Sequence, residues 1–250
     1  MNLDIAKNYT SKSQIARVVT ENWLFENGFC PSCGSNLSEV NNNAQVHDFS
    51  CFSCNDQYEL KSFHGNTPAK VNDGAYDSMI KRILDVTSPH FVFLGYDQSY
   101  SVVNCFAVPN YLFHASIIEK RKPLALTARR AGWTGCMILL NQIPNIGKIK
   151  LVENGIFVQR GIVRTAWDKT RALTEQVNIE SRGWTLDILC CVEKLNTNFS
   201  LSEMYAFESQ LSIKHPQNKH IKEKIRQQLQ ALRNIGFVEF VKPGFYKYIK

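Results

Sequence analysis

Four cysteines in two closely spaced pairs place the strongest constraint on how this chain folds. The pairs are Cys30-Pro-Ser-Cys33 and Cys51-Phe-Ser-Cys54, separated by seventeen residues. A two-residue gap lets one tight turn present two thiolates, and four thiolates complete the tetrahedral shell of a structural zinc ion. The spacing therefore predicts a closed zinc site of the zinc-ribbon type, with Cys30, Cys33, Cys51 and Cys54 as ligands.

The remaining cysteines have no such spacing and lie in apolar runs, where we expect core positions: Cys105, Cys136, Cys190 and Cys191. The longest apolar runs, such as 91–94, are too short to span a bilayer, and the N-terminus has no signal-peptide pattern. We therefore expect a cytoplasmic protein with no membrane partner. Its thiols should be reduced, which favours metal binding over disulfides.

The order of expected elements predicts an α/β core followed by a second, smaller unit. Hydrophobic periodicity predicts a helix over 11–27 capped by Ser13, strands over 57–62, 91–96 and 102–108, a helix over 72–84, and strands over 137–140 and 147–152. The pattern weakens from 160 to 181. We therefore divide the chain into domains covering 1–180 and 181–250.

The second unit has the element order of a winged helix. We expect helices over 185–194, from Ser200 or Ser202 to Leu211, and over 219–234 with Asn218 as its cap, then strands over 237–241 and 245–249 around a Pro-Gly turn. From residue 181 onward, eleven Lys and Arg face six Asp and Glu, a net charge of +5. Such a basic unit suits a phosphate backbone, although a solvated basic face without a partner would have the same composition.

A second constellation overlaps the cysteine pairs. In Glu59-Leu60-Lys61 the first and third side chains point to one face of a strand, and Asp48 can return on an adjacent strand. Two carboxylates and the Leu60 carbonyl can hold Mg²⁺, while Lys61 reaches the attacking water or a phosphate, which would suit phosphodiester hydrolysis. Taken alone, Glu-x-Lys occurs on strands by chance, and an exposed salt bridge is its default interpretation.

Asp48 with Glu59-x-Lys61 resembles the signature of the PD-(D/E)xK nucleases, although His47 stands in place of the proline that names the superfamily. More of the chain resembles the DpnI-like, dam-replacing family of methyl-directed type II restriction endonucleases, in segments 30–61, 72–76, 121–125, 127–133, 181–185 and 220–229. The resemblance implies a PD-(D/E)xK core with an embedded zinc site and a C-terminal winged helix. It also implies double-strand cuts within GATC carrying N6-methyladenine on both strands, with methyl reading by both domains.

DNA contacts are expected in two places. In the nuclease domain, Trp133 beside Arg129 and Arg130 could wall a methyl pocket, although Trp133 could equally be core. In the second unit, the helix over 219–230 would enter the major groove and supply phosphate and base contacts from Lys219, Lys222, Lys224, Arg226, Gln227 and Gln228. Those lysines could also be merely solvated.

The resulting hypothesis is a site-specific deoxyribonuclease with catalytic Mg²⁺, structural Zn²⁺ and methylated double-stranded DNA as its partner. One alternative is a non-catalytic DNA-binding regulator with a zinc ribbon and a winged helix, in which Glu59-Leu60-Lys61 is inert. A weaker alternative is an RNA-binding protein. The sequence shows no dimer-forming surface, so we expect a monomer.

Overall fold

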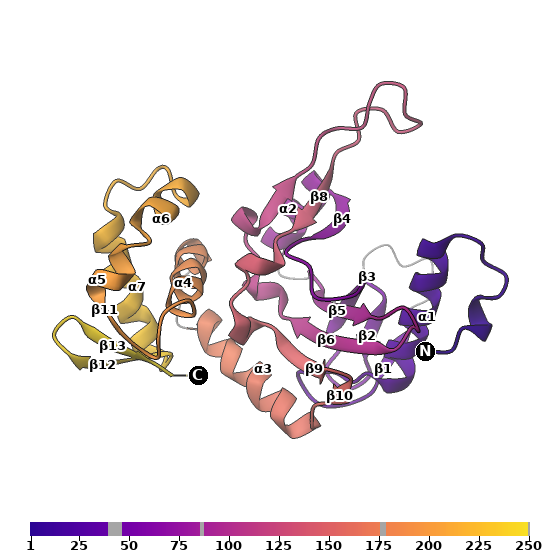
Figure 1. The fold of residues 1–250 in the computed structure, drawn as a ribbon, viewed down its shortest axis with the longest axis horizontal. Coiled ribbons are helices and arrows are strands. Elements are labelled where there is room, and N and C mark those ends of the chain that lie inside the picture. Colours follow the sequence, from indigo (N-terminus) through magenta and orange to yellow (C-terminus); the bar gives the residue numbers. More distant parts are fainter. Residues whose placement is uncertain (40–46, 86–87, 176–178, 250) are drawn as a thin grey trace.

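A seven-stranded mixed sheet lies at the centre of the larger unit (Figure 1). The computed structural model describes residues 1–39, 47–85, 88–175 and 179–249. The strands of this sheet, in spatial order, are β1 (Leu37–Glu39), β2 (Phe49–Cys51), β3 (Gln57–His64), β5 (His90–Tyr96), β6 (Val102–Val108), β9 (Ile149–Glu153) and β10 (Ile156–Phe157). Only the pair β3–β5 is parallel among the strands described, and the other neighbours are antiparallel.

Both faces of the central strand β5 are buried, because its side chains alternate between two apolar clusters. Val92 and Leu94 pack with α1 (Lys12–Asn27) and α3 (Arg160–Glu175) on one face. Phe91 and Phe93 pack on the other face, toward α2 (Tyr76–Leu84) and a second sheet. A strand covered on both faces reads as a continuous apolar run. This sandwich of layers fixes β3 next to β5, and β3 carries the candidate site.

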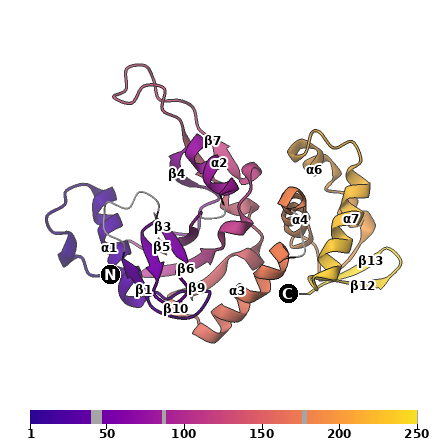
Figure 2. The ribbon, with the colours of Figure 1, turned by 180° about the vertical axis from the view of Figure 1, so that it is seen from behind.

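The second sheet has three strands in the order β4 (Val71–Ala75), β8 (Gly135–Ile138) and β7 (Ile118–Lys120). Together with α2, its strand β4 forms the crossover between the parallel strands β3 and β5. The segment 121–134, between β7 and β8, projects away from the body of the molecule in both views (Figures 1 and 2). Its base is anchored by hydrogen bonds such as Arg121 N–H to the Gly135 carbonyl at 3.0 Å.

The C-terminal unit combines helices with a three-stranded sheet in the order β11-β13-β12. Its elements are α4 (Ile179–Val192), β11 (Asn198–Ser200), α5 (Leu201–Tyr205), α6 (Glu208–Lys214), α7 (Ile221–Asn234), β12 (Val238–Lys242) and β13 (Phe245–Tyr248). Ser200 begins α5 with a capping box, because its hydroxyl accepts from Glu203 N–H and Glu203 accepts from Ser200 N–H. A hairpin beside packed helices, with β11 completing the sheet, is the winged-helix arrangement that the element order predicted.

Helix α4 joins the two units, and one apolar cluster runs through it without interruption. Glu193, directly after α4, accepts from the backbone N–H groups of Asn145 and Ile146 at 2.7 and 3.2 Å. Its carboxylate also accepts from the Tyr248 hydroxyl at 3.2 Å. One side chain therefore ties the short helix η5 (Asn145–Gly147) of the larger unit to β13 of the smaller one. The other short helices are η1 (Asp4–Ala6), η2 (Asn110–Leu112), η3 (Ala115–Ile117) and η4 (Leu140–Gln142).

The predicted strand over 102–108 agrees with β6, but one prediction in the larger unit was wrong. Residues 72–75 are not helical, because Val71–Ala75 pairs with β8 and only Tyr76–Leu84 forms a helix. Sheet pairing thus overrides the local pattern. The region 160–175, where the sequence pattern weakens, is the sixteen-residue helix α3. Its buried stripe includes the polar Thr170 between Trp167 and Leu173, which obscured the apolar periodicity.

Capping predictions also differ from the structure. Ser11 stands at the N-cap of α1 and Ser13 lies within the helix, where their hydroxyls are 2.9 Å apart. Asn218 accepts from His220 N–H at 2.7 Å, while His220 itself is the N-cap residue of α7. The predicted boundary between 180 and 181 falls in the first turn of α4. Among the described residues, no helix has the length and apolar character needed to cross a bilayer.

Candidate functional site

The two cysteine turns share one backbone design. In the first, Gly34 N–H donates to the Cys30 carbonyl at 2.8 Å and Gly34 has φ +83°. In the second, Asn55 N–H donates to the Cys51 carbonyl at 3.1 Å and Asn55 has φ +59°. The residue after each pair has a left-handed backbone conformation, which reverses the chain. Gly and Asn adopt this conformation most readily. Two equivalent turns therefore face each other with two thiols each.

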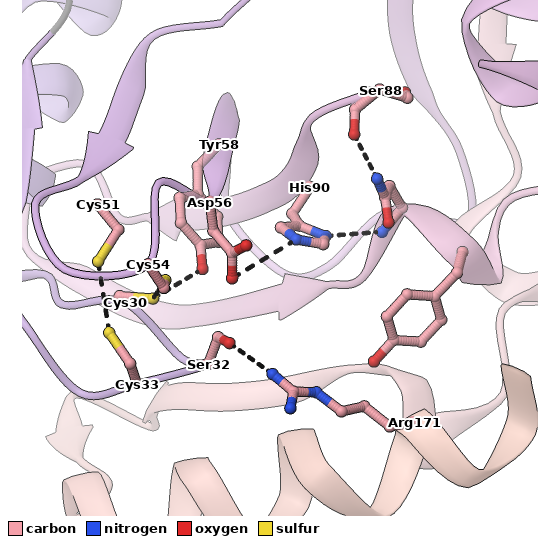
Figure 3. A network of polar contacts seen from close by, with 12 residues as sticks. Cys30, Ser32, Cys33, Cys51, Cys54, Asp56, Tyr58, Ser88, His90 and Arg171 are labelled. Atoms are coloured by element: carbon pink, nitrogen blue, oxygen red, sulfur yellow. Dashed lines mark hydrogen bonds and ion pairs between the residues drawn. The ribbon is translucent and has the colours of Figure 1, made fainter. Parts of the chain in front are cut away.

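The four sulfur atoms converge, as Figure 3 shows. All lie within 4.8 Å of one another, and the cross pairs Cys30–Cys54 and Cys33–Cys51 are 3.5 and 3.4 Å apart. A disulfide would bring two sulfurs to about 2.05 Å, whereas four ligands about 2.3 Å from a tetrahedral zinc lie roughly 3.8 Å apart. The geometry therefore fits a metal ion, and Cys30, Cys33, Cys51 and Cys54 form a cluster that could hold one.

The electrostatics of the thiols also favour a cation. Burial raises the pKa of Cys30 to about 11. Burial alone would raise the pKa of Cys33 as well, but hydrogen bonds from Ser35 outweigh it and lower that pKa to about 6. Thiols this close cannot all ionise at neutral pH without a positive charge among them.

The cysteine cluster is fastened to the sheet and to α3. Cys30 Sγ lies 3.0 Å from the hydroxyl of Tyr58 on β3, so the hydroxyl can donate to a thiolate. Arg171 of α3 donates to the Ser32 hydroxyl at 2.8 Å (Figure 3). Arg160, at the start of α3, donates to the Gly34 carbonyl at 2.8 Å. These contacts make the cluster part of the framework that holds β3.

The opposite face of β3 carries the acid–amine cluster, which we define as Glu59, Lys61, Asp73 and Arg82. Lys61 Nζ lies 2.6 Å from Glu59 Oε1 and also contacts the carboxylate of Asp73 on β4. Arg82 of α2 pairs with the other oxygen of Glu59. Strand alternation explains the arrangement, because Tyr58 and Leu60 pack toward the cysteine side.

Asp48 lies beside this cluster. Its carboxylate accepts from Leu60 N–H at 2.8 Å, and its own N–H donates to the Tyr58 carbonyl at 3.0 Å. Burial raises the pKa of Asp48, and the negative charge of Glu59 adds to that rise. Two neighbouring carboxyl groups next to a backbone carbonyl suit a divalent cation with oxygen ligands.

The charge of Lys61 is secured by its neighbours. Burial lowers the pKa of its amine, but the carboxylates of Glu59 and Asp73 outweigh burial and leave that pKa raised. Asp73 and Arg82 were both missed as site residues. Asp73 fell within a predicted helix, and no local pattern connects Arg82 with Glu59, twenty-three residues earlier.

The projecting segment 121–134 holds the first group of predicted DNA contacts. Trp133 is half-buried, and the guanidinium of Arg130 lies 4.9 Å from its ring centre. Arg129 is exposed, and at the tip of the segment the side chain of Leu126 is 92% exposed. The segment therefore presents basic and apolar groups together. Trp133 lies at its base and packs over the position of Gly135, where a Cβ would meet the indole ring at 2.8 Å.

Helix α7 carries most of the second group. Lys222, Arg226 and Gln227 are exposed, and Lys224 is half-buried with its amine 6.0 Å from the ring centre of Trp184. Lys219 is exposed but precedes the helix.

Gln228 does not face solvent, contrary to its expected role in reaching base edges. It is 2% exposed, and its amide oxygen accepts from the Thr185 hydroxyl at 2.6 Å. The helical period turns Gln228 into the core and leaves Gln227 outside. In addition, Lys222 pairs with Glu208 at 3.4 Å and Arg226 donates to the Tyr205 hydroxyl at 2.7 Å.

Comparison with known protein families accounts for both units. The model of the Dam-replacing family, DpnI, matches residues 1–176, and the model of the Dam-replacing HTH domain matches residues 180–248. The first match contains the cysteine cluster, the acid–amine cluster and the projecting segment, and the second contains the basic helix α7. The resemblance inferred from the sequence is thereby confirmed. This chain belongs to the Dam-replacing, DpnI-like family, and that membership implies a methylation-dependent restriction endonuclease.

Proposed function

We propose that this protein is a Mg²⁺-dependent endonuclease that cuts both strands of DNA at GATC sites carrying N6-methyladenine, and that its cysteine cluster holds a structural Zn²⁺. The observation that carries the proposal is the convergence of Asp48 and Glu59 with the amine of Lys61 on one partly buried face of β3. A module that only binds DNA has no need of such a group, since buried charges cost free energy. The family membership supports the same reading.

The roles of the residues follow from their chemistry and correspond to a PD-(D/E)xK core. Asp48, Glu59 and the Leu60 carbonyl would hold Mg²⁺ as hard oxygen ligands. When bound, magnesium supplies charge neutralisation at the scissile phosphate and lowers the pKa of a coordinated water. Lys61 donates hydrogen bonds that orient the attacking water or the phosphate. Arg82, beside Glu59, adds a second positive charge for the phosphate oxygens.

Zinc in the cysteine cluster would be structural because four thiolates leave no open coordination position for water. The cysteine cluster offers four soft sulfur ligands and leaves no coordination position open. The group around Glu59 offers hard oxygen ligands and leaves positions open for water. The Tyr58 hydroxyl, 3.0 Å from Cys30 Sγ, would donate to one zinc-bound thiolate.

Methyl discrimination requires more than one contact. Burying one methyl group contributes about 0.8 kcal/mol, which is less than a tenfold preference. Two surfaces that each read one methyl group multiply their preferences. We assign these roles to two surfaces. The first is segment 121–134, with Arg129, Arg130 and Trp133. The second is α7 with the residue that precedes its cap, and comprises Lys219, Lys222, Lys224, Arg226 and Gln227.

The test compares the wild-type protein with Glu59→Gln on methylated and unmethylated plasmid, with and without Mg²⁺. The wild-type protein should linearise only methylated plasmid and only with Mg²⁺. Glu59→Gln should lower the cleavage rate at least about 10²-fold, the scale of removing one transition-state contact. Its zinc content and its affinity for methylated duplex, measured in Ca²⁺, should be retained.

Glu153→Gln is the matched control, since Glu153 forms an exposed ion pair with Lys150 on β9, in the same sheet but outside the site. It should cleave like the wild-type protein. Methylated plasmid left intact by the wild-type protein would leave the non-catalytic DNA-binding regulator as the explanation. Cleavage or tighter binding of RNA of the same sequence would favour an RNA-directed function.

We further propose that residues 1–180 form the nuclease domain and 181–250 the winged-helix domain, in a protein that acts as a cytoplasmic monomer. The reducing cytoplasm keeps thiols available for metal. Sedimentation of the free protein near 28.6 kDa would agree with the monomer.

A further inference from the structure

Asp73 occupies a position that the proposed metal chemistry does not use. It lies on β4 opposite Cys136 of β8, next to a register irregularity between Asp73 and Ala75. Its side chain is 3% exposed and its carboxylate contacts Lys61 Nζ. A carboxylate this well covered costs free energy unless it is paired. Its amine partner, Lys61, is on the other sheet.

Lys61 has two acidic partners with different roles in the proposed site. Glu59 lies on the same strand, 2.6 Å from Nζ, and is the expected cation ligand. If the oxygens of Glu59 bound a metal ion, the ion pair between Glu59 and the amine of Lys61 would be weaker. A lysine side chain has four flexible carbons and a strongly hydrated head, so its position depends on a second fixed partner. Asp73 is that partner.

The contact also joins two parts of the molecule that must act together. Strand β8, which pairs with β4, begins at Gly135 immediately after the projecting segment 121–134. The backbone N–H of Tyr76, following β4, donates to the Thr134 carbonyl at 3.0 Å. The strand that holds the amine through Asp73 is therefore the same strand that anchors the DNA-facing segment. The amine and that segment share one rigid frame.

We infer that Asp73 is a positioning residue that fixes the amine of Lys61 for phosphodiester cleavage and sets it relative to the DNA held by segment 121–134. This inference rests on the proposed nuclease function. Asp73 acts through Lys61 and takes no part as a metal ligand or proton carrier. A misplacement of about 1 Å in such a group costs up to about 10²-fold in rate.

The experiment measures single-turnover cleavage of methylated duplex by the full-length protein and its variants Asp73→Asn and Asp73→Glu. Asp73→Asn should lower kcat about 10- to 100-fold, while KM and the Mg²⁺ affinity measured by calorimetry stay within about twofold of wild type. Asp73→Glu keeps the charge but shifts it by one methylene. Its kcat should therefore lie between that of the wild-type protein and that of Asp73→Asn. Glu119→Gln is the matched control, because Glu119 pairs with Lys70 at 2.9 Å on the same small sheet and is exposed.

Each outcome has a defined meaning. Wild-type kcat in Asp73→Asn would overturn the inference, and so would a loss of Mg²⁺ affinity parallel to the loss of rate, which would make Asp73 a metal ligand. If Asp73→Asn does not fold, Asp73→Glu decides alone, and a wild-type kcat in that variant overturns the inference. Failure of the wild-type protein to cleave would instead refute the proposed function, which keeps the two failures distinct.

Discussion

The cysteine cluster and the acid–amine cluster lie on opposite faces of the same strand, yet they are built by opposite principles. The cysteine cluster takes its ligands from two short turns, in which two residues separate the members of each pair. The acid–amine cluster draws on β3, β4 and α2, and the tertiary fold alone brings Asp73 and Arg82 to Glu59 and Lys61. The comparison shows that local spacing can encode the cysteine cluster, whereas the acid–amine cluster is assembled by the tertiary fold.

The two clusters also differ in what they do to stability. Thiolates around a bound cation would gain free energy from every ligand, and the site would be closed. Asp48 and Glu59 instead repel each other, which together with burial raises the pKa of Asp48. The cysteine cluster with a bound cation would therefore stabilise the fold, whereas the proximity of Asp48 and Glu59 lowers the stability of the fold. Three substitutions test this contrast, in order of expected effect.

Loss of one thiolate should have the largest effect. Cys51→Ser should unfold the larger unit at 25 °C, since structural zinc contributes about 10–16 kcal/mol in small zinc-binding peptides. The measurement is zinc content by metal analysis, combined with far-UV circular dichroism.

Cys190→Ala provides the control, because Cys190 is half-buried outside the cluster and donates to the Gln142 carbonyl at 3.3 Å. It should keep its zinc and its fold. A soluble, zinc-free and active Cys51→Ser protein would show that the cysteine cluster is not the framework.

Removing the charge of Asp48 should separate activity from stability. The pKa of Asp48 is raised in the folded protein, so its contribution to stability is present below the unfolded-state pKa and is lost as pH rises through the folded-state pKa. Above its folded-state pKa the ionised group therefore destabilises the fold. Asp48→Asn should unfold at higher temperature in Mg²⁺-free buffer, with a gain of about 1 kcal/mol, and should lose cleavage about 10²-fold or more.

The gain should also depend on pH in a defined direction. Thermal melts should show it near pH 7 and show it vanishing as pH falls well below the unfolded-state pKa of about 3.9, where the carboxyl is protonated in both states. A variant that is destabilised at pH 7 would mean that the hydrogen bond from Leu60 N–H outweighs the repulsion by Glu59.

The smallest effect is expected at the residue that connects the clusters. Tyr58→Phe removes the hydroxyl beside Cys30 and keeps the ring in the core. Zinc affinity, measured by competition with a chelator, should fall about 10- to 100-fold, as is typical for a partner of a metal ligand. Tyr111→Phe, which loses a contact with the Thr170 hydroxyl at 2.7 Å, should leave zinc affinity unchanged. A zinc affinity of Tyr58→Phe equal to that of the wild-type protein would show that the Tyr58 hydroxyl on β3 does not support the cysteine cluster.

Much of the fold could be predicted where one physical signal dominates. The buried strand 102–108 and the winged-helix hairpin follow from alternation and turn residues. The helix over 160–175 could not be recognised, because Thr170 occupies a core position through its hydrogen bonds to Trp167 and Tyr111. The extended conformation of 72–75 depends on pairing with Cys136, which is remote in sequence.

The candidate site divides in the same way. Asp48, Glu59 and Lys61 were expected together, and the structure brings them close because Asp48 directly precedes β2, which pairs with β3. Asp73 and Arg82 come from the crossover between β3 and β5, whose path no local pattern specifies. Gln228 was instead included wrongly among the exposed residues. Gln227 and Gln228 are adjacent and differ only in the helical face that they occupy, which the sequence did not reveal.

The carboxylate of Glu193, which accepts from Asn145 and Ile146 on one side and from Tyr248 on the other, makes the C-terminal unit a fixed extension of the larger one. The separation between segment 121–134 and α7 is therefore set by packing and not by the flexibility of a linker. Each residue inserted into α4 would move Glu193 by about 1.5 Å along the helix axis and turn it by about 100°, which would break its hydrogen bonds to η5.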